Sequence, residues 1–210
     1  MEGRRVKQPL GVILAGGQAT RMGGGDKARL ALAGRCLLDF VRDRIAPQVA
    51  DLAINANGDP ARWADTHLQV IPDSVAGHPG PLAGVLAGLD WAAEHGADHI
   101  VTVAGDTPFF PQDLVPQLLW ASETQNQPIA MAATQDGAGG KIWRQPTFGL
   151  WPVALRGDLR AALAGGVRKV VVWADAHGVA NAVFATQPYD PFFNVNTPAD
   201  LDVAQQMVVA

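Results

Sequence analysis

Short apolar runs that alternate with helix-like segments constrain the fold of this chain most strongly. The runs expected to form strands cover residues 10–14, 52–54, 68–71, 99–103 and 129–133. Segments with an apolar residue every three or four positions lie between them, at about 37–45, 81–95 and 112–121. Strands that alternate with helices of this length indicate βαβ units. The sequence therefore predicts an α/β fold with a mostly parallel sheet.

The composition is that of a globular protein and excludes several classes of function. The chain has 210 residues, 48% of them hydrophobic, which suits one domain with a sizeable core. Its formal net charge of −4 argues against a basic face for nucleic acid or membrane surfaces. Cys36 is the single cysteine, so neither a disulfide framework nor a cysteine zinc cluster is expected. With no signal-peptide pattern and no apolar stretch of membrane-spanning length, we expect a cytoplasmic protein without nucleic-acid or membrane partners.

A glycine-rich segment directly follows the first expected strand and ends at Lys27. Glycine has no Cβ, so the backbone N–H groups of such a segment can approach a ligand closely. Successive N–H groups that point into one concavity bind anions, above all phosphates. Arg21 and Lys27 add positive charge at the two ends of the segment. The pattern predicts a polyphosphate site, the alternative being a mobile glycine-rich turn.

Two familiar phosphate-binding loops do not match this segment. A P-loop needs Gly-Lys-[Ser/Thr], but Lys27 follows Asp26 and precedes Ala28. A dinucleotide fingerprint needs the spacing G-x-G-x-x-G, whereas Gly16 and Gly17 are adjacent. These mismatches also disfavour a nicotinamide-dependent oxidoreductase.

Polar residues stand at or after the ends of three further expected strands. Asn55, Asp73 and Asp106 follow the second, third and fourth runs. In parallel α/β sheets, ligands bind beyond the carboxyl ends of the strands, so these residues are candidates for one site. A carboxylate beside a polyphosphate suits Mg²⁺, which makes Asp106 the candidate metal ligand. Each residue could instead serve its own turn, and the sequence leaves that open.

The final third of the chain is less clearly patterned. A strand is expected at 147–151, a helix at 155–163 and a late strand at 191–196, while 167–173 stays undecided. Strand alternation would put Asn194 and Asn196 on the same side, where Asn196 could add a carbonyl oxygen to the metal. Hydrogen bonding at the strand end is the alternative for both. Pro198 is expected to start the last helix, with Thr197 as its N-cap.

Two other common chemistries lack their residues. Neither serine of the chain, Ser74 or Ser122, lies in G-x-S-x-G, so an α/β-hydrolase nucleophile is absent. The five histidines show no H-E-x-x-H or other paired metal spacing.

With these residues placed, the chain resembles the molybdenum cofactor guanylyltransferases (the MobA family) of the nucleotidyltransferase superfamily. The resemblance covers nearly the whole sequence. Its motifs are L-A-G-G at 14–17, R-M-G at 21–23, D-K at 26–27, N-A-N at 55–57, G-P-L-A-G at 80–84, D-T-P at 106–108 and N-V-N-T-P at 194–198. The first motif is shared across the superfamily, and its combination with G-P-L-A-G and N-V-N-T-P is more specific.

The resemblance implies a Rossmann-like three-layer sandwich that forms a single nucleotidyltransferase domain over residues 1–210. It implies transfer of GMP from GTP to molybdenum-bound molybdopterin, with Mg²⁺ as cofactor and pyrophosphate as product. Nucleotide-binding residues would be Leu14, Ala15, Gly16, Gly17, Lys27, Asn55, Asp73 and Asp106. Arg21, Lys27 and Asp106 would be catalytic, with Asp106 and Asn196 at the metal. Gly80, Pro81, Asn194 and Asn196 are candidates for contact with the second substrate.

Rival functions remain open. A cytidylyl- or sugar-nucleotidyltransferase belongs to the same superfamily, but the related cytidylyltransferases resemble L-A-A-G at the loop and lack G-P-L-A-G. Gly16 and Gly17 thus favour guanine by comparison. A non-catalytic molybdopterin carrier would need no special role for Asp106. Since the product must reach client enzymes, transient contact with molybdenum-insertion proteins or client chaperones is also expected.

Overall fold

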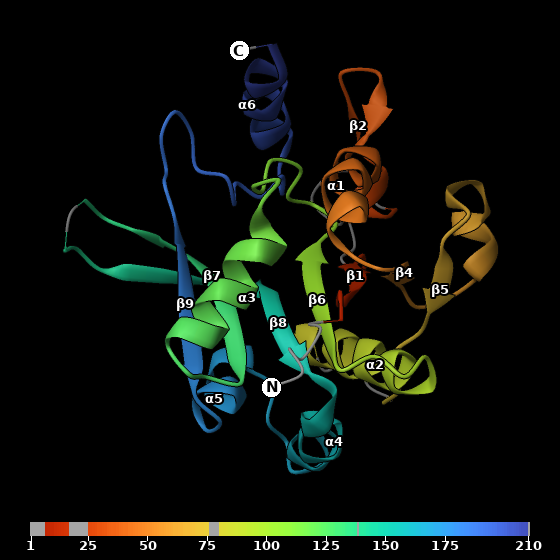
Figure 1. Cartoon of the computed structure of the whole chain (residues 1–210). Coiled ribbons are helices and arrows are strands. Elements are labelled where there is room, and N and C mark those ends of the chain that lie inside the picture. The colour runs from red at the N-terminus through yellow and green to blue at the C-terminus, as the bar shows by residue number, and fades with distance from the viewer. Residues whose placement is uncertain (1–6, 17–24, 76–79, 138, 210) are drawn as a thin grey trace.

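A seven-stranded sheet forms the centre of the protein, which we describe from a computed structural model (Figure 1). The structure describes residues 7–16, 25–75, 80–137 and 139–209. The sheet has the order β5-β4-β1-β6-β8-β7-β9. Its strands are β1 (Leu10–Leu14), β4 (Leu52–Asn55), β5 (Gln69–Ile71), β6 (His99–Ala104), β7 (Ile129–Gln135), β8 (Ile142–Pro152) and β9 (Val179–Phe184). The α-helices are α1 (Leu37–Ile45), α2 (Pro81–Glu94), α3 (Leu114–Thr124), α4 (Arg156–Ala164), α5 (Val170–Asp175) and α6 (Pro198–Val209).

Most strand pairs are parallel, as the alternation of strands and helices predicts. β1 pairs in parallel with β4 and β6, β4 with β5, and β7 with β9. β8 alone among these strands runs antiparallel, to β6 and to β7. The hairpin between β7 and β8 extends away from the helices (Figure 1). Because β1, β4, β5 and β6 all run the same way, the turns at their carboxyl ends meet at one edge of the sheet.

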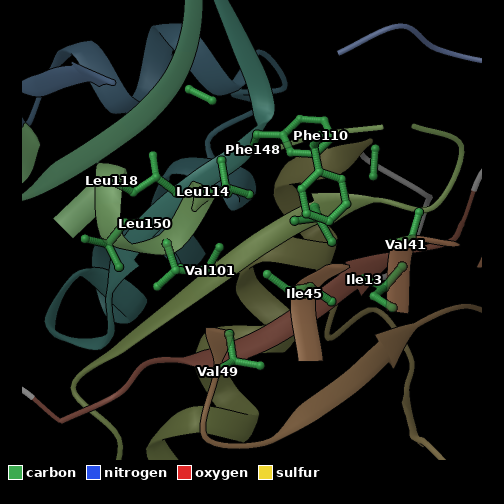
Figure 2. Packing of buried hydrophobic residues seen from close by; sticks show 14 of the residues in the cluster. Ile13, Val41, Ile45, Val49, Val101, Phe110, Leu114, Leu118, Phe148 and Leu150 are labelled. Carbon is green, nitrogen blue, oxygen red and sulfur yellow. The ribbon is translucent and has the colours of Figure 1, made fainter. Parts of the chain in front are cut away.

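Helices cover both faces of the sheet, which confirms the predicted three-layer α/β sandwich. On one face, α1 and α3 pack on strand residues such as Ile13, Val101 and Leu150, as the close view of this cluster shows (Figure 2). On the other, α2, α4 and α5 pack on residues such as Val12 and Trp151. Val12 and Ile13 are neighbours that serve opposite faces, because successive strand side chains point to opposite sides.

Two glycines let α2 pack tightly against the sheet. A Cβ on Gly88 would lie 2.8 Å from both Ile100 Cδ1 and Val12 Cγ2. A Cβ on Gly84 would lie 2.7 Å from Leu14 Cδ2 and would overlap Asn55 Oδ1. The first turns of α2 are thereby held close to the ends of β1 and β4, where the polar residues lie.

A small third cluster joins the last helix to the chain after the glycine-rich segment. The hairpin of β2 (Ala31–Leu32) and β3 (Arg35–Cys36) contributes buried Leu32, which packs with Val195 and Ala204. α6 lies beside β2 at the top of the view in Figure 1. This contact brings the segment at 194–197 next to the segment that carries Lys27.

Some expectations for the last third of the chain are wrong. Residues 191–196 form a turn and an irregular segment, not a strand. A backbone hydrogen bond from Val195 N–H to Asp106 O (2.9 Å) joins this segment to the turn after β6. Strand β9 lies at the edge of the sheet and was not expected. Its sequence contains two alanines and an asparagine and so shows little apolar alternation. The undecided residues 167–173 contain the start of helix α5, where burial of Val170 and Trp173 overrides the preference of valine for strands.

The helices within the described part of the chain are all too short or too polar to span a bilayer.

Candidate functional site

A cleft of about 1020 Å³ opens at the carboxyl edge of the sheet. The chain runs outward from β1 through β4 to β5 and then returns to β6 on the other side of β1, so the strand order reverses at β1. Ligands of open α/β sheets bind at such a reversal. The cleft is lined by Leu14, Ala15, Gly16, Gly25, Asp26, Lys27, Ala28, Asn55, Ala56, Asn57, Gly58, Arg62, Asp73, Gly80, Pro81, Ala104, Gly105, Asp106 and Thr147.

The end of β1 forms the floor of the cleft. Ala15 N–H donates to Asn55 O (2.9 Å), and Leu14 O accepts from Gly105 N–H (3.0 Å), so three strand ends are held together. A Cβ on Gly16 would meet nothing within 4 Å, so this glycine borders open space. Gly17 and Arg21, two of the predicted phosphate-binding residues, lie outside the described residues.

Lys27 and Asp106 form an ion pair at the point where the strand order reverses. Lys27 Nζ lies 3.6 Å from Asp106 Oδ2, and each side chain is about one-fifth exposed (23% and 21%). Lys27 Nζ also donates to Asn196 Oδ1 at 2.6 Å. The lysine is therefore held from two sides, by one residue from the middle of the sequence and one from near its end, with its charge at the cleft.

The backbone at Asn196 is itself fixed by the last helix. The N–H groups of Asn196 and Thr197 donate to Asp200 Oδ2 (2.9 and 2.8 Å), and Asp200 N–H donates back to Thr197 Oγ1 (3.2 Å). This reciprocal pattern caps α6 at Thr197, as expected. The bonds from Asn196 and Thr197, with Asn196 N–H contributing most, hold the pKa of Asp200 below its usual value.

Asn55, Asn57 and Asp73 form a second polar group at the other end of the cleft. Asp73 Oδ1 accepts from Asn55 Nδ2 (3.1 Å) and Asp73 Oδ2 from Asn57 Nδ2 (2.8 Å). Asn57 Oδ1 in turn accepts from Asp73 N–H (2.9 Å), and Asn55 Nδ2 also donates to Ile71 O (3.0 Å). Both oxygens of Asp73 thus have a fixed direction, and each retains lone pairs for a ligand.

Gly80 and Pro81 lie on the wall of the cleft at the start of α2. Gly80 has φ 81° and ψ −162°, a conformation that only glycine adopts readily, and Pro81 occupies the first helical turn. Of the other two residues expected at the second substrate, Asn196 contacts Lys27, as described. Asn194 Oδ1 accepts a hydrogen bond from buried Thr107 Oγ1.

The two asparagines do not share a hydrogen-bond partner, although strand alternation would put them on the same side. The segment is irregular, so its side chains do not alternate, and Asn194 and Asn196 bond different partners. Neither borders the cleft directly.

Two polar side chains that line the cleft, Thr147 and Arg62, lie outside the sequence motifs described above. Thr147 comes from the antiparallel strand β8 and Arg62 from the 3₁₀ segment η4 (Pro60–Thr66). Neither stands at the end of a parallel strand, where the sequence predicts the site: Thr147 lies within β8, and Arg62 lies in the segment between β4 and β5.

Acidic ligands for a metal are sparse: the described residues contain no group of three or more His, Cys, Asp or Glu side chains that could hold an ion. Asp106 is the carboxylate at the reversal point, and its Oδ1 accepts one bond, from Thr107 Oγ1 at 3.3 Å. Mg²⁺ is commonly held by one or two carboxylates, with water and substrate phosphates as its other ligands. Asp106 therefore suits Mg²⁺ only when a phosphate-bearing ligand supplies further oxygen atoms to the ion.

A mostly parallel sheet with a polar cleft at its reversal point and a lysine–aspartate pair inside is typical of α/β enzymes that bind nucleotides. Residues 11–179 match the model of the MobA-like NTP transferase domain. The chain belongs to this family and is a nucleotidyltransferase.

Curated relatives agree with this assignment, and a solved structure shares the fold. Two proteins named molybdenum cofactor guanylyltransferase are similar over most of the chain. The one from Bradyrhizobium sp. (strain ORS 278) is 49% identical over 94% of this chain and 92% of its own length. The one from Rhodopseudomonas palustris (strain HaA2) is 50% identical over 96% of this chain and 92% of its own. Molybdopterin-guanine dinucleotide biosynthesis protein A from Archaeoglobus fulgidus has the same fold, with a TM-score of 0.72 at 21% identity over 95% of this chain and 98% of that one.

Proposed function

We propose that this chain transfers GMP from GTP to the terminal phosphate of molybdenum-bound molybdopterin and releases pyrophosphate. The observation that carries the proposal is the polar cleft at the reversal of the sheet, in a chain about 50% identical to proteins named for that reaction. We infer that one nucleotidyltransferase domain spans residues 1–210 and that Gly17 and Arg21 join the described residues in binding the nucleotide.

The two ends of the cleft suit the two ends of GTP. The turn at residues 14–16, which is hydrogen-bonded to Asn55 and Gly105, would face the triphosphate together with the cation of Lys27. Asn55 and Asp73, at the end of β4 and just after β5, would face the nucleoside. A nucleotide laid across the ends of four neighbouring strands would bury its phosphates beside Lys27 and Asp106.

The reaction needs positioning and charge neutralisation more than covalent chemistry. In the transition state, charge builds up on the α-phosphate and on the leaving pyrophosphate, and Lys27 supplies fixed positive charge there. Asn196 orients Lys27, since its Oδ1 lies 2.6 Å from Nζ. The attacking terminal phosphate of the acceptor is already an anion near neutral pH, so no general base is required.

Mg²⁺ is the cofactor that we propose, with Asp106 as its protein ligand and Asn196 as a candidate second ligand. When bound, the ion supplies positive charge to the phosphate oxygens. Asp106 also keeps Lys27 at the reversal point through their 3.6 Å ion pair.

The test is release of pyrophosphate from GTP in the presence of Mg²⁺ and molybdopterin-loaded protein, with CTP and UTP as controls. We expect release with GTP and at least tenfold less with CTP or UTP. Release with CTP or UTP instead would assign the chain to a cytidylyl- or sugar-nucleotidyltransferase activity. Binding of molybdopterin with no nucleotide-dependent release would identify a carrier.

A further inference from the structure

Two arginine–aspartate pairs join the segment that carries Lys27 to the segment η4. Asp26 precedes the short 3₁₀ turn η2 (Lys27–Arg29) and pairs with Arg62 of η4, at 2.9 and 2.8 Å from Nη1 to the two carboxylate oxygens. Arg29 ends the same turn and pairs with Asp65 of η4, at 2.7 and 2.5 Å. Each segment thus contributes one arginine and one aspartate, spaced three residues apart.

The Arg62 guanidinium is held in place by further contacts. Its Nη2 donates to Asn57 O (2.5 Å) and its Nε to Asp59 O (3.2 Å). Gly58, with φ +87°, leaves it room, because a Cβ there would lie 3.3 Å from Arg62 Nη2. The guanidinium carbon also lies 5.9 Å from the centre of the Trp63 ring. The side chain is 40% exposed, but all three of its nitrogens donate to fixed acceptors, which restrains the plane of the guanidinium.

Arg62 connects the two ends of the cleft through these contacts. On one side it bonds Asp26, the residue directly before Lys27. On the other it bonds the backbone of Asn57, whose side chain makes two hydrogen bonds with Asp73. The phosphate end and the nucleoside end are therefore linked by one side chain on the wall of the cleft.

We propose that Arg62 is a positioning residue for nucleotidyl transfer, one that fixes the distance between the phosphate end and the nucleoside end of the cleft. This inference rests on the proposed function, because it takes Lys27 and Asp73 to hold opposite ends of one nucleotide. Asp26 neutralises the guanidinium with both carboxylate oxygens, so Arg62 acts through Lys27 and Asn57 and does not bind a phosphate itself.

The kinetic signature of such a residue is a loss of kcat with little change in KM. In Arg62→Ala, GTP keeps its contacts at both ends of the cleft, so we expect KM to change by less than about threefold. The α-phosphate is no longer held in line with the acceptor, and a misplacement of this kind lowers kcat by about 10- to 100-fold. Arg62→Lys keeps the charge but not the forked geometry, so we expect it to recover less than a third of the loss.

Asp26→Asn separates positioning from direct phosphate binding. If Arg62 is a positioning residue, Asp26→Asn lowers kcat as Arg62→Ala does, and the double variant is about as slow as either single variant. If Arg62 were a phosphate ligand, loss of Asp26 would free its charge for GTP and lower KM. A lower KM in Asp26→Asn, or full activity in Arg62→Lys, would overturn the proposal.

Arg35→Ala is the matched control, because Arg35 also pairs with an aspartate (Asp43, 2.5 Å) but does not border the cleft. We expect its kcat and KM to stay within twofold of the unchanged chain. Hydrogen exchange gives a readout without turnover: the amides of Arg29 and Leu30, bonded to Asp26 O and Lys27 O, should exchange faster in Arg62→Ala and not in Arg35→Ala. Unchanged exchange at these amides would contradict the proposal.

The same experiments distinguish this inference from the proposed function. The unchanged chain is first assayed with GTP, CTP and UTP. If another nucleotide is the substrate, the guanylyl proposal fails, and the Arg62 variants are then measured with that nucleotide. If GTP is the substrate and Arg62→Ala is fully active, only the inference about Arg62 fails.

Discussion

Lys27 Nζ lies 3.6 Å from Asp106 Oδ2, although the two residues follow different strands, β1 and β6. β1 and β6 are hydrogen-bonded neighbours, with Leu14 opposite Ala104 at their carboxyl ends. The loops that leave these two ends therefore begin side by side. A cation and a carboxylate at this point can act on the same phosphate group.

Asp106→Ala should lower turnover strongly and leave the fold intact. The side chain is partly exposed, and its one bond to a buried residue is the long contact from Thr107 Oγ1 (3.3 Å), so the change removes charge at the cleft and little packing. Loss of one strong electrostatic contact of this kind costs about 3 kcal/mol, roughly a hundredfold in rate. Pyrophosphate release measures the loss, and circular dichroism checks the fold. An active Asp106→Ala variant would reject the metal role, and Asp106→Asn, which keeps the shape, should be nearly as slow.

Asn196→Ala should lower activity less than Lys27→Ala. Removal of Lys27 takes a cation from the phosphates, with an expected loss of about a hundredfold in kcat/KM. Removal of the Asn196 amide leaves that cation present but less well oriented, so we expect a loss of about tenfold. Steady-state kinetics with GTP measures both. Equal losses in the two variants would mean that Asn196 does more than orient Lys27, for example as a ligand of the metal.

Gly84→Ala should destabilise the protein and weaken nucleotide binding together. The new methyl group would lie 2.7 Å from Leu14 Cδ2 and overlap Asn55 Oδ1, so helix α2 or the end of β4 must shift. Overpacking of this kind costs about 1–3 kcal/mol of unfolding free energy. Gly157→Ala is the control, because its Cβ would meet nothing within 4 Å and alanine favours a helix. Urea unfolding should show Gly84→Ala to be less stable than the unchanged chain and Gly157→Ala no less stable.

The Arg29–Asp65 pair should make stability depend on acid pH. The hydrogen bond from Arg29 lowers the pKa of Asp65 to about 2. Because the folded pKa lies below the unfolded one, the pair stabilises the fold above the usual aspartate pKa and loses its effect as the pH falls from about 4 toward 2. A carboxyl titration by NMR should place the Asp65 midpoint near pH 2. The stability difference between the unchanged chain and Asp65→Asn should shrink over the same range, and a constant difference would contradict the assignment.

Much of the fold follows from local pattern. The apolar runs at 10–14, 52–54, 99–103 and 129–133 lie within strands, the run at 68–71 coincides with β5 except for Leu68, and the helix beginning at Pro81 starts where expected. These elements are long or strongly patterned, so local sequence and burial agree. The irregular segment at 191–196 and the helix at Val170 follow tertiary packing against the rest of the chain, and local pattern did not predict them.

For the site, the sequence by itself determined which residues stand at strand ends: the turn after β1, Asn55, Asp73 and Asp106. Parallel strands of an α/β sheet present those ends at one edge, so their nearness follows from the fold class. Only the tertiary structure decided that Asn196 orients Lys27, that Asn57 fixes Asp73 and that Arg62 lines the cleft. The physical reason is that these contacts join segments distant in sequence, and their geometry depends on strand order and on how closely α2, η4 and α6 pack at that edge.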